Sequence, residues 1–395
     1  HDLSAAKGGY LPSVTVTAGT GREQTDSAST RASGNHRVDL QRSESSISLQ
    51  QTVFDGFATS SEVGRQRATV NSRAYKVLNT AEAVALNTVQ VYLDVLQRQE
   101  FVKQAESNLA NHERIYDQIK LRSEQGVGRL ADLEQVEARL AQAKNNLLTE
   151  QTNLEDAKTN FYSVTGIEPD SLSLPDVSVL VIPASLADAR RIMLANNPVL
   201  KSAQSDITAT EQQYQATKSS YYPRVNVELE RTMDNNVDGT RGHNNEWQAM
   251  VRMRYNLYQG GSTQANAEAK AYQVKEAQDV RNNTLRQLNE ELRLAWSALN
   301  NARQQIPIAM QYADRSMKVR TAYQKQFSIG ERTLLDLLDS ENELLTAQRR
   351  LVEIQFTERF TEYRIKARMG ELLQNLAIQS LSLIHISEPT RLGMI

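Results

Sequence analysis

The chain has 395 residues, a formal net charge of −2, eight prolines, 17 glycines and no cysteine. The balanced charge argues against a nucleic-acid partner, because nucleic-acid-binding domains usually carry a basic excess. The absence of cysteine excludes disulfides, thiolate metal sites and cysteine nucleophiles. No apolar run reaches 18 residues, so the sequence predicts no transmembrane helix.

Two pairs of β-strands are predicted, because apolar and polar residues alternate with period two. The first pair covers about 10–18 and 46–54, and the second covers about 222–231 and 247–258. Each segment has about ten residues, the length that crosses a membrane as a tilted strand. The alternation predicts one apolar and one polar face for each strand.

Long polar stretches separate the strands of each pair, at 19–45 and 232–246, and indicate exposed loops. Aromatic residues mark the strand ends, as they do at membrane interfaces. The aromatic residues expected at such an interface are Tyr10, Phe54, Tyr222, Trp247 and Tyr258. A soluble sheet with one face on a core would show the same alternation, so the strands alone favour neither reading.

After each strand pair the sequence predicts a long antiparallel helical hairpin, over 57–165 and 261–370. The first arm of each hairpin continues for roughly 100 Å at 1.5 Å per residue, and Pro307 is the only proline in either arm. Apolar residues step by three and four along the second arm, which indicates a heptad-like seam. Ordinary globular helices are three to four turns long, so these hairpins are exceptional.

The two halves form an internal repeat. We expect a first repeat over 1–166, an equatorial or linker segment over 167–198 and a second repeat over 199–380. The second copy has a helical stretch over 185–220 ahead of its strands, so we expect a corresponding helix ahead of residue 1. The recurring landmarks are Tyr10-Leu11-Pro12 with Tyr221-Tyr222-Pro223, Phe54-Asp55-Gly56 with Tyr258-Gln259-Gly260, Val127-Gly128 with Ile329-Gly330, and Thr165-Gly166 with Met369-Gly370.

Four strands cannot close a membrane barrel, whose minimum is about eight. An open sheet edge in lipid would leave backbone groups without hydrogen-bond partners, which is prohibitive. If the strands lie in a membrane, the barrel must therefore be shared between subunits.

These features resemble the TolC-type outer-membrane channel-tunnel family. The resemblance rests on the strand entries at Pro12 and Pro223, the strand-to-helix junctions and the hairpin tips, and it covers about 9–380. It implies an α+β membrane protein with long antiparallel hairpins that form an α-barrel tunnel. Four β-strands per chain would contribute to a shared 12-stranded trimeric β-barrel.

The resemblance also implies a function and a set of partners. The chain would be the outer-membrane exit duct of a tripartite export system in a Gram-negative bacterium, with a large periplasmic part. Its partners would be two further copies in a homotrimer, outer-membrane lipid, a periplasmic adaptor protein and an inner-membrane ABC-type or proton-driven pump. The family is not enzymatic and needs no cofactor.

Within the family, the motif Ile-Tyr-Asp-Gln-Ile at 115–119 precedes the first hairpin tip. With this motif the chain looks most like the outer-membrane partners of type I protein secretion. Multidrug efflux channels share the same architecture and are the alternative. A soluble periplasmic coiled-coil adaptor or structural protein is an alternative of another class, although it would carry its strands in a compact barrel beside a single hairpin.

In this family, carboxylate rings and salt links between inner and outer helices close the periplasmic entrance. The matching positions are Asp336 and Asp339 for the rings, and Arg332 for a link to Glu134. The family often has an aromatic residue with a hydroxyl group that assists this link. Phe327 stands at that position and has no hydroxyl, so a looser link is expected. The alternative is a solvated helix start, where aspartate is common. The hairpin tips would contact the adaptor through Gly128, Arg129, Gly330 and Glu331.

The sequence carries no catalytic motif: it has no Walker loop, no Gly-x-Ser-x-Gly and no His-Glu-x-x-His. Its five histidines are scattered, so neither a catalytic site nor a metal site is expected. The stretch 381–395 resembles the translation of a transposon-derived sequencing adapter, and we set it aside from the fold.

Overall fold

The structure is a computed structural model, and it describes residues 1–34, 36–175 and 180–378. The adapter-like stretch and part of the predicted linker lie outside the described residues. The elements in chain order are α1 (Asp2–Gly8), β1 (Ser13–Thr25), α2 (Ala28–Ala32), β2 (Val38–Phe54), α3 (Ala58–Glu124), α4 (Leu130–Thr165), α5 (Leu186–Asn196), α6 (Pro198–Lys218), the 3-10 turn η2 (Ser219–Tyr221), β3 (Arg224–Asn235), β4 (His243–Arg254), α7 (Ser262–Ser328), α8 (Leu334–Met369) and α9 (Leu372–Asn375). None of the helices in the described part combines the length and hydropathy needed to cross a membrane.

The chain divides into two compact units. The first contains His1–Tyr75 and Lys201–Thr284, and therefore the whole sheet; the second contains Lys76–Leu200 and the chain from Leu285 onward, with both hairpin tips. Each unit draws on both predicted repeats.

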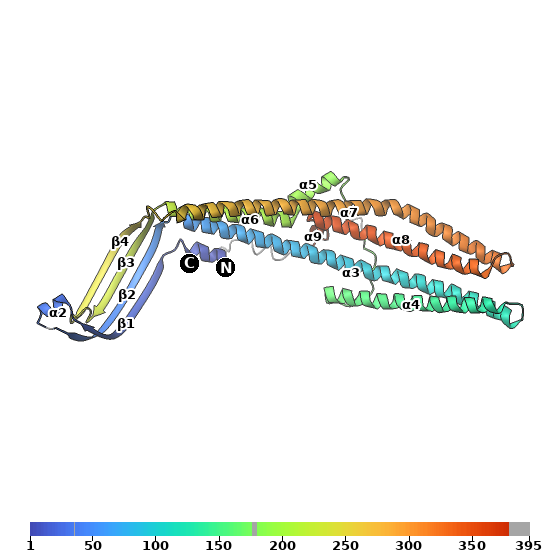
Figure 1. The fold of residues 1–395 in the computed structure, drawn as a ribbon, viewed down its shortest axis with the longest axis horizontal. Coiled ribbons are helices and arrows are strands. Elements are labelled where there is room, and N and C mark those ends of the chain that lie inside the picture. Colours follow the sequence, from blue (N-terminus) through green and yellow to red (C-terminus); the bar gives the residue numbers. More distant parts are fainter. Residues whose placement is uncertain (35, 176–179, 379–395) are drawn as a thin grey trace. The chain divides into compact units, whose positions relative to one another are not determined.

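The sheet of the first unit is antiparallel, with the order β1-β2-β3-β4 (Figure 1). Apolar residues meet across the strands, as Val16 does with Ile47 and Val227 with Val251. Val16 and Val251 are about 70% and 72% exposed, so the apolar face of the sheet is uncovered in the single chain. β1 and β4 form the two edges, and neither pairs with a further strand of the described chain.

Both strand pairs extend into stretches that we expected to be loops. In the second pair, Thr232–Asn235 pair with residues 243–246, and β4 ends at Arg254 instead of the predicted 258. The extension of the first pair is longer. Gly19–Thr25 pair with residues 38–44 and extend the ladder into a stretch that we expected to be a loop. The β1 part of the extension has no apolar side chain, and the β2 part has two, Val38 and the buried Leu40. Cross-strand contacts stabilise it, such as the hydrogen bond from Thr20 Oγ1 to the carbonyl of Arg42, at 3.2 Å. Because residues 19–25 contain no apolar side chain, they show no alternation and their sequence resembles a loop.

Both hairpins have the predicted antiparallel form (Figure 1), and corresponding arms of the two hairpins have equal lengths. α3 and α7 have 67 residues each, and α4 and α8 have 36 each. At the tips, Gly126 and Gly330 have φ values of 70° and 82°, which only glycine adopts freely. Gly126, two residues before Gly128, is therefore the counterpart of Gly330, and our pairing of Gly128 with Gly330 was shifted.

Candidate functional site

The two hairpin tips pack against each other through an apolar cluster in the second unit. Its buried members come from all four long helices: Ile115, Ile119, Val136, Phe327, Leu334, Leu337 and Leu338. Burying such side chains contributes roughly 1.5–3 kcal/mol each. The cluster fixes the start of α8 and hence the positions of the acidic residues predicted to form the gate.

The start of α8 is capped. Thr333 Oγ1 accepts a hydrogen bond from the backbone N–H of Asp336 at 3.2 Å, which satisfies one of the unpaired donors of the first turn. The Asp336 side chain remains 41% exposed. Its carboxylate is thus partly exposed to solvent at the hairpin tip.

Arg332 is held within its own tip. Its Nε donates to Gln326 at 3.0 Å, its Nη1 lies 3.7 Å from Asp336, and its guanidinium carbon lies 4.1 Å from the ring centre of Tyr323. Glu134 takes part in none of the ion pairs found within the described chain, so the expected Arg332–Glu134 link is not formed in the single chain. Tyr323 was missed, although it lies one helical turn before Phe327 on the same helix.

A different ion pair joins the two hairpins near the tips. Arg139 on α4 donates from Nη2 to Asp339 on α8 at 3.0 Å, and the two side chains are 28% and 58% exposed. The predicted Asp339 is therefore a link residue as well as a charge at the tip. Arg139 could not be identified from the sequence, because the partners are far apart along the chain.

Further from the tips, two buried carboxylates, one on α8 and one on α4, form similar links between helices. Glu341 is only 3% exposed; it lies 3.2 Å from Arg320 on α7 and accepts a hydrogen bond from Asn111 on α3 at 3.0 Å. Glu150 on α4 pairs with Arg349 at 2.5 Å. Removing one member of such a pair would leave an uncompensated buried charge, which is costly.

The residues predicted for the adaptor contact lie at the exposed tips. Gly128, Arg129, Gly330 and Glu331 are all exposed. Two apolar side chains accompany them, Val127 at 80% exposed and Ile329 at 69%. An added Cβ at Gly128 would lie 3.0 Å from the backbone nitrogen of Ser123, so the close approach of the chain favours glycine there.

The predicted interface aromatics lie at both ends of the apolar face. Phe54 and Tyr222 form an edge-to-face cluster with Phe57, with ring centres 5.5–6.4 Å apart. Trp247 is opposite Arg231 in the ladder and is 76% exposed. Tyr10 and Tyr258 are also exposed.

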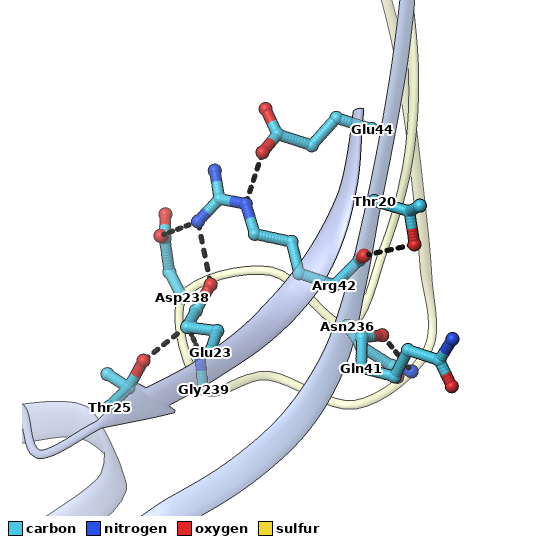
Figure 2. Close-up of polar contacts among 9 residues, drawn as sticks. All are labelled: Thr20, Glu23, Thr25, Gln41, Arg42, Glu44, Asn236, Asp238 and Gly239. Carbon is cyan, nitrogen blue, oxygen red and sulfur yellow. Dashed lines mark hydrogen bonds and ion pairs between the residues drawn. The ribbon is translucent and has the colours of Figure 1, made fainter. Parts of the chain in front are cut away.

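The end of the sheet that contains the β3–β4 turn carries a polar cluster that the sequence did not predict. Figure 2 shows Arg42 between Glu23, Glu44 and Asp238, with Nη1 2.7 Å from Glu23 and 3.2 Å from Asp238. The backbone N–H of Gly239 also donates to Glu23, at 2.9 Å. Hydrogen bonds from Thr25 and then Arg42 lower the pKa of Glu23 to about 2. The cluster ties the β3–β4 turn to β1 and β2.

The profile of the family described as outer membrane efflux protein matches residues 2–167 and 190–364. The chain belongs to this family. The outer membrane efflux protein BepC of Brucella suis biovar 1 is 24% identical over 94% of this chain and 80% of its own. The alkaline protease secretion protein AprF of Pseudomonas aeruginosa is 19% identical over 88% and 74%. The crystal structure of the outer membrane protein VceC of Vibrio cholerae matches with a TM-score of 0.80 and 15% identity, over 93% of this chain and 89% of VceC.

The protein is therefore an outer-membrane exit duct of a tripartite export system, in the outer membrane of a Gram-negative bacterium. The sequence-based predictions of family, fold class, location and function are confirmed. As a channel of this family it is a transport protein and not an enzyme. Among the described residues, no group of three or more His, Cys, Asp or Glu side chains could hold a metal ion.

Proposed function

We propose that three copies of this chain assemble into a TolC-type duct with a shared 12-stranded barrel. The observation that carries this proposal is the uncovered apolar face of a four-stranded sheet with two open edges. Backbone groups on an edge in lipid have no water to bind, so β1 of one subunit would pair with β4 of the next. TolC-type channels are trimeric, which supports a closed ring of three.

The periplasmic entrance is proposed to be gated at the hairpin tips. Asp336 and Asp339 from three subunits would place six carboxylates around one axis, which favours cations and resists anions. The Arg139–Asp339 ion pair would hold the two hairpins of each subunit together in the resting state. Arg332 would act within the second tip through Asp336 and Tyr323.

The partners are proposed to be a periplasmic adaptor and an inner-membrane pump. The exposed Val127 and Ile329 at the tips offer apolar contacts to an adaptor, beside the charged Arg129 and Glu331. We favour type I protein secretion, which is supported by the motif at 115–119 and by the similarity to AprF. Small-molecule efflux, suggested by the similarity to BepC, is the second candidate.

Disulfide cross-linking tests the shared barrel directly, because the protein has no cysteine of its own. Single cysteines placed along β1, at 14–18, are combined with single cysteines along β4, at 247–251, and the protein is oxidised in outer membranes. A closed ring predicts dimers and trimers on a denaturing gel for one register only. Cysteines introduced at the same depth in β2 and β3 form intramolecular bonds and serve as the control. Failure of every β1–β4 pair to cross-link between chains would contradict the proposal.

Secretion and efflux are separated by complementation. A host that lacks its own exit duct is supplied with this protein, the cognate adaptor and the cognate pump. Export of a protease substrate without a gain in drug resistance supports type I secretion, and the reverse result supports efflux.

A further inference from the structure

The polar face of the sheet, opposite the apolar face, carries arginines at one end. This end holds the start of β3, which follows η2, and the end of β4, which precedes α7. Arg224 on β3 and Arg254 on β4 alternate with the apolar-face residues Val225 and Met253. The ladder places Arg224 directly opposite Arg254. Residues opposite each other in an antiparallel pair have Cβ atoms about 4.5–5.5 Å apart, and like charges in this position are destabilising.

Two other arginines on this face have counter-charges: Arg42, as described above, and Arg252. Arg252 pairs through Nε with Glu228 at 2.9 Å. In contrast, Arg224 and Arg254 take part in none of the ion pairs or side-chain hydrogen bonds found among residues 1–34, 36–175 and 180–378. Within the described chain, therefore, no carboxylate forms an ion pair with either of these two guanidinium groups.

Arg224 and Arg254 line one recess of about 590 Å³. Its other polar lining residues include hydroxyl and amide groups that can donate hydrogen bonds, at Ser219, Ser220 and Asn256. The recess is thus rich in donors and has room for an ion or a small charged group.

Two carboxylates also line this recess, but each is held by other donors. Asp55 accepts hydrogen bonds from the backbone N–H and the hydroxyl of Thr59, at 2.8 and 2.5 Å, and so caps the start of α3. Glu62 accepts two hydrogen bonds from Arg65, each at 2.7 Å. Neither carboxylate is paired with Arg224 or Arg254.

We propose that Arg224 and Arg254 form a binding site for oxyanions. These are the carboxylate or phosphate groups of the material that passes through the duct. The guanidinium fork matches both groups with paired, charge-assisted hydrogen bonds. The site faces the interior because the opposite face is the apolar one, and in this respect it rests on the proposed function. Three subunits would bring six such guanidinium groups together at the base of the barrel.

Citrate, a small polyvalent carboxylate, serves as the probe for detergent-solubilised protein. We expect citrate to raise the melting temperature of the parent, because a ligand that binds the folded state stabilises it. The variant Arg224→Gln/Arg254→Gln should lose this rise, and its citrate affinity by calorimetry should fall at least about tenfold. Arg252→Gln is the control, since it removes one positive charge from the same face of β4 and leaves both arginines of the proposed site in place.

The melting temperature without citrate separates binding from a purely structural role. Relief of like-charge repulsion predicts that the double variant melts at or above the temperature of the parent. A lower melting temperature would mean that the two arginines stabilise the fold, and would overturn the proposal. Equal citrate binding by the double variant and the parent, or equal loss of binding in Arg252→Gln, would overturn it as well.

Binding in detergent requires no conduction, so this experiment fails independently of the proposed function. Trimers that conduct ions but bind citrate equally with and without the two arginines would refute the site and leave the duct. Citrate binding that depends on the two arginines, in a protein whose β1 and β4 edges never cross-link, would refute the shared barrel and leave the site.

Discussion

Substitution of Arg139 by glutamine should loosen the resting closure of the periplasmic entrance. The change removes the only charge that joins Asp339 to α4 in the described chain, and it keeps a side chain of similar length and polarity. The apolar cluster beneath the tips is untouched, so the fold should remain. The expected effect is therefore on the closed-to-open equilibrium and not on assembly.

The size of the effect follows from the exposure of the pair. Arg139 is 28% exposed and Asp339 is 58% exposed, which places the link among partly exposed ion pairs worth about 0–1 kcal/mol. In the proposed trimer three links would act together around one axis, so the closed state would lose up to about 3 kcal/mol. Since about 1.4 kcal/mol corresponds to tenfold, the open population could rise by up to about 100-fold.

Single-channel recording in planar bilayers measures this change. Arg139→Gln should raise the mean conductance or the time spent open, and Asp339→Asn should do the same. The double variant should open no more than either single variant, because the same link is lost. Additive effects of the two substitutions would show that the residues act separately and would refute the link.

Arg332→Ser provides the comparison. The sequence suggested that this change would break a link to Glu134, but in the structure Arg332 contacts Asp336 and Tyr323 of its own tip. We therefore expect a smaller increase in conductance than in Arg139→Gln. A larger increase would indicate that Arg332 carries the main closing contact in the assembled duct.

Two further predictions concern stability and pH. Gly370→Ala should lower the melting temperature more than Gly166→Ala: both glycines have positive φ, but only at Gly370 would the added Cβ lie 2.8 Å from the carbonyl oxygen of Asn196. Because the pKa of Glu23 is lowered to about 2, its contacts to the β3–β4 turn should persist above about pH 4.5 and be lost as the pH falls towards 2. Pepsin cleavage of this turn, normalised to an unstructured peptide, should rise over that interval in the parent, whereas Glu23→Gln should be cleaved readily throughout; a pH-independent parent would contradict the assignment.

The regular elements could be predicted because their signals are local. Uninterrupted helical periodicity and the glycines at 166 and 370 located the hairpins within a few residues. Period-two alternation located the apolar parts of the four strands. The extension of β1 and β2 was missed, because residues 19–25 have no apolar side chain and residues 38–44 have only two, which is too few to show an alternation.

The site was predictable only in part. Asp336 and Asp339 lie at the start of α8, as expected, but their partners depend on how four helices pack. The pairing of Asp339 with Arg139 joins residues on different hairpins, and a single sequence contains no signal for it. Tyr323 illustrates a contact that could have been anticipated, since it precedes Phe327 by one turn of the same helix.

We expect this chain to complete its barrel only with two further copies of itself. Native mass spectrometry of the protein extracted from outer membranes tests it most directly, because the number of chains in the complex is read from the mass. A shared barrel predicts a single species with the mass of three chains. A stable species with the mass of one chain in the same extract would contradict the shared barrel.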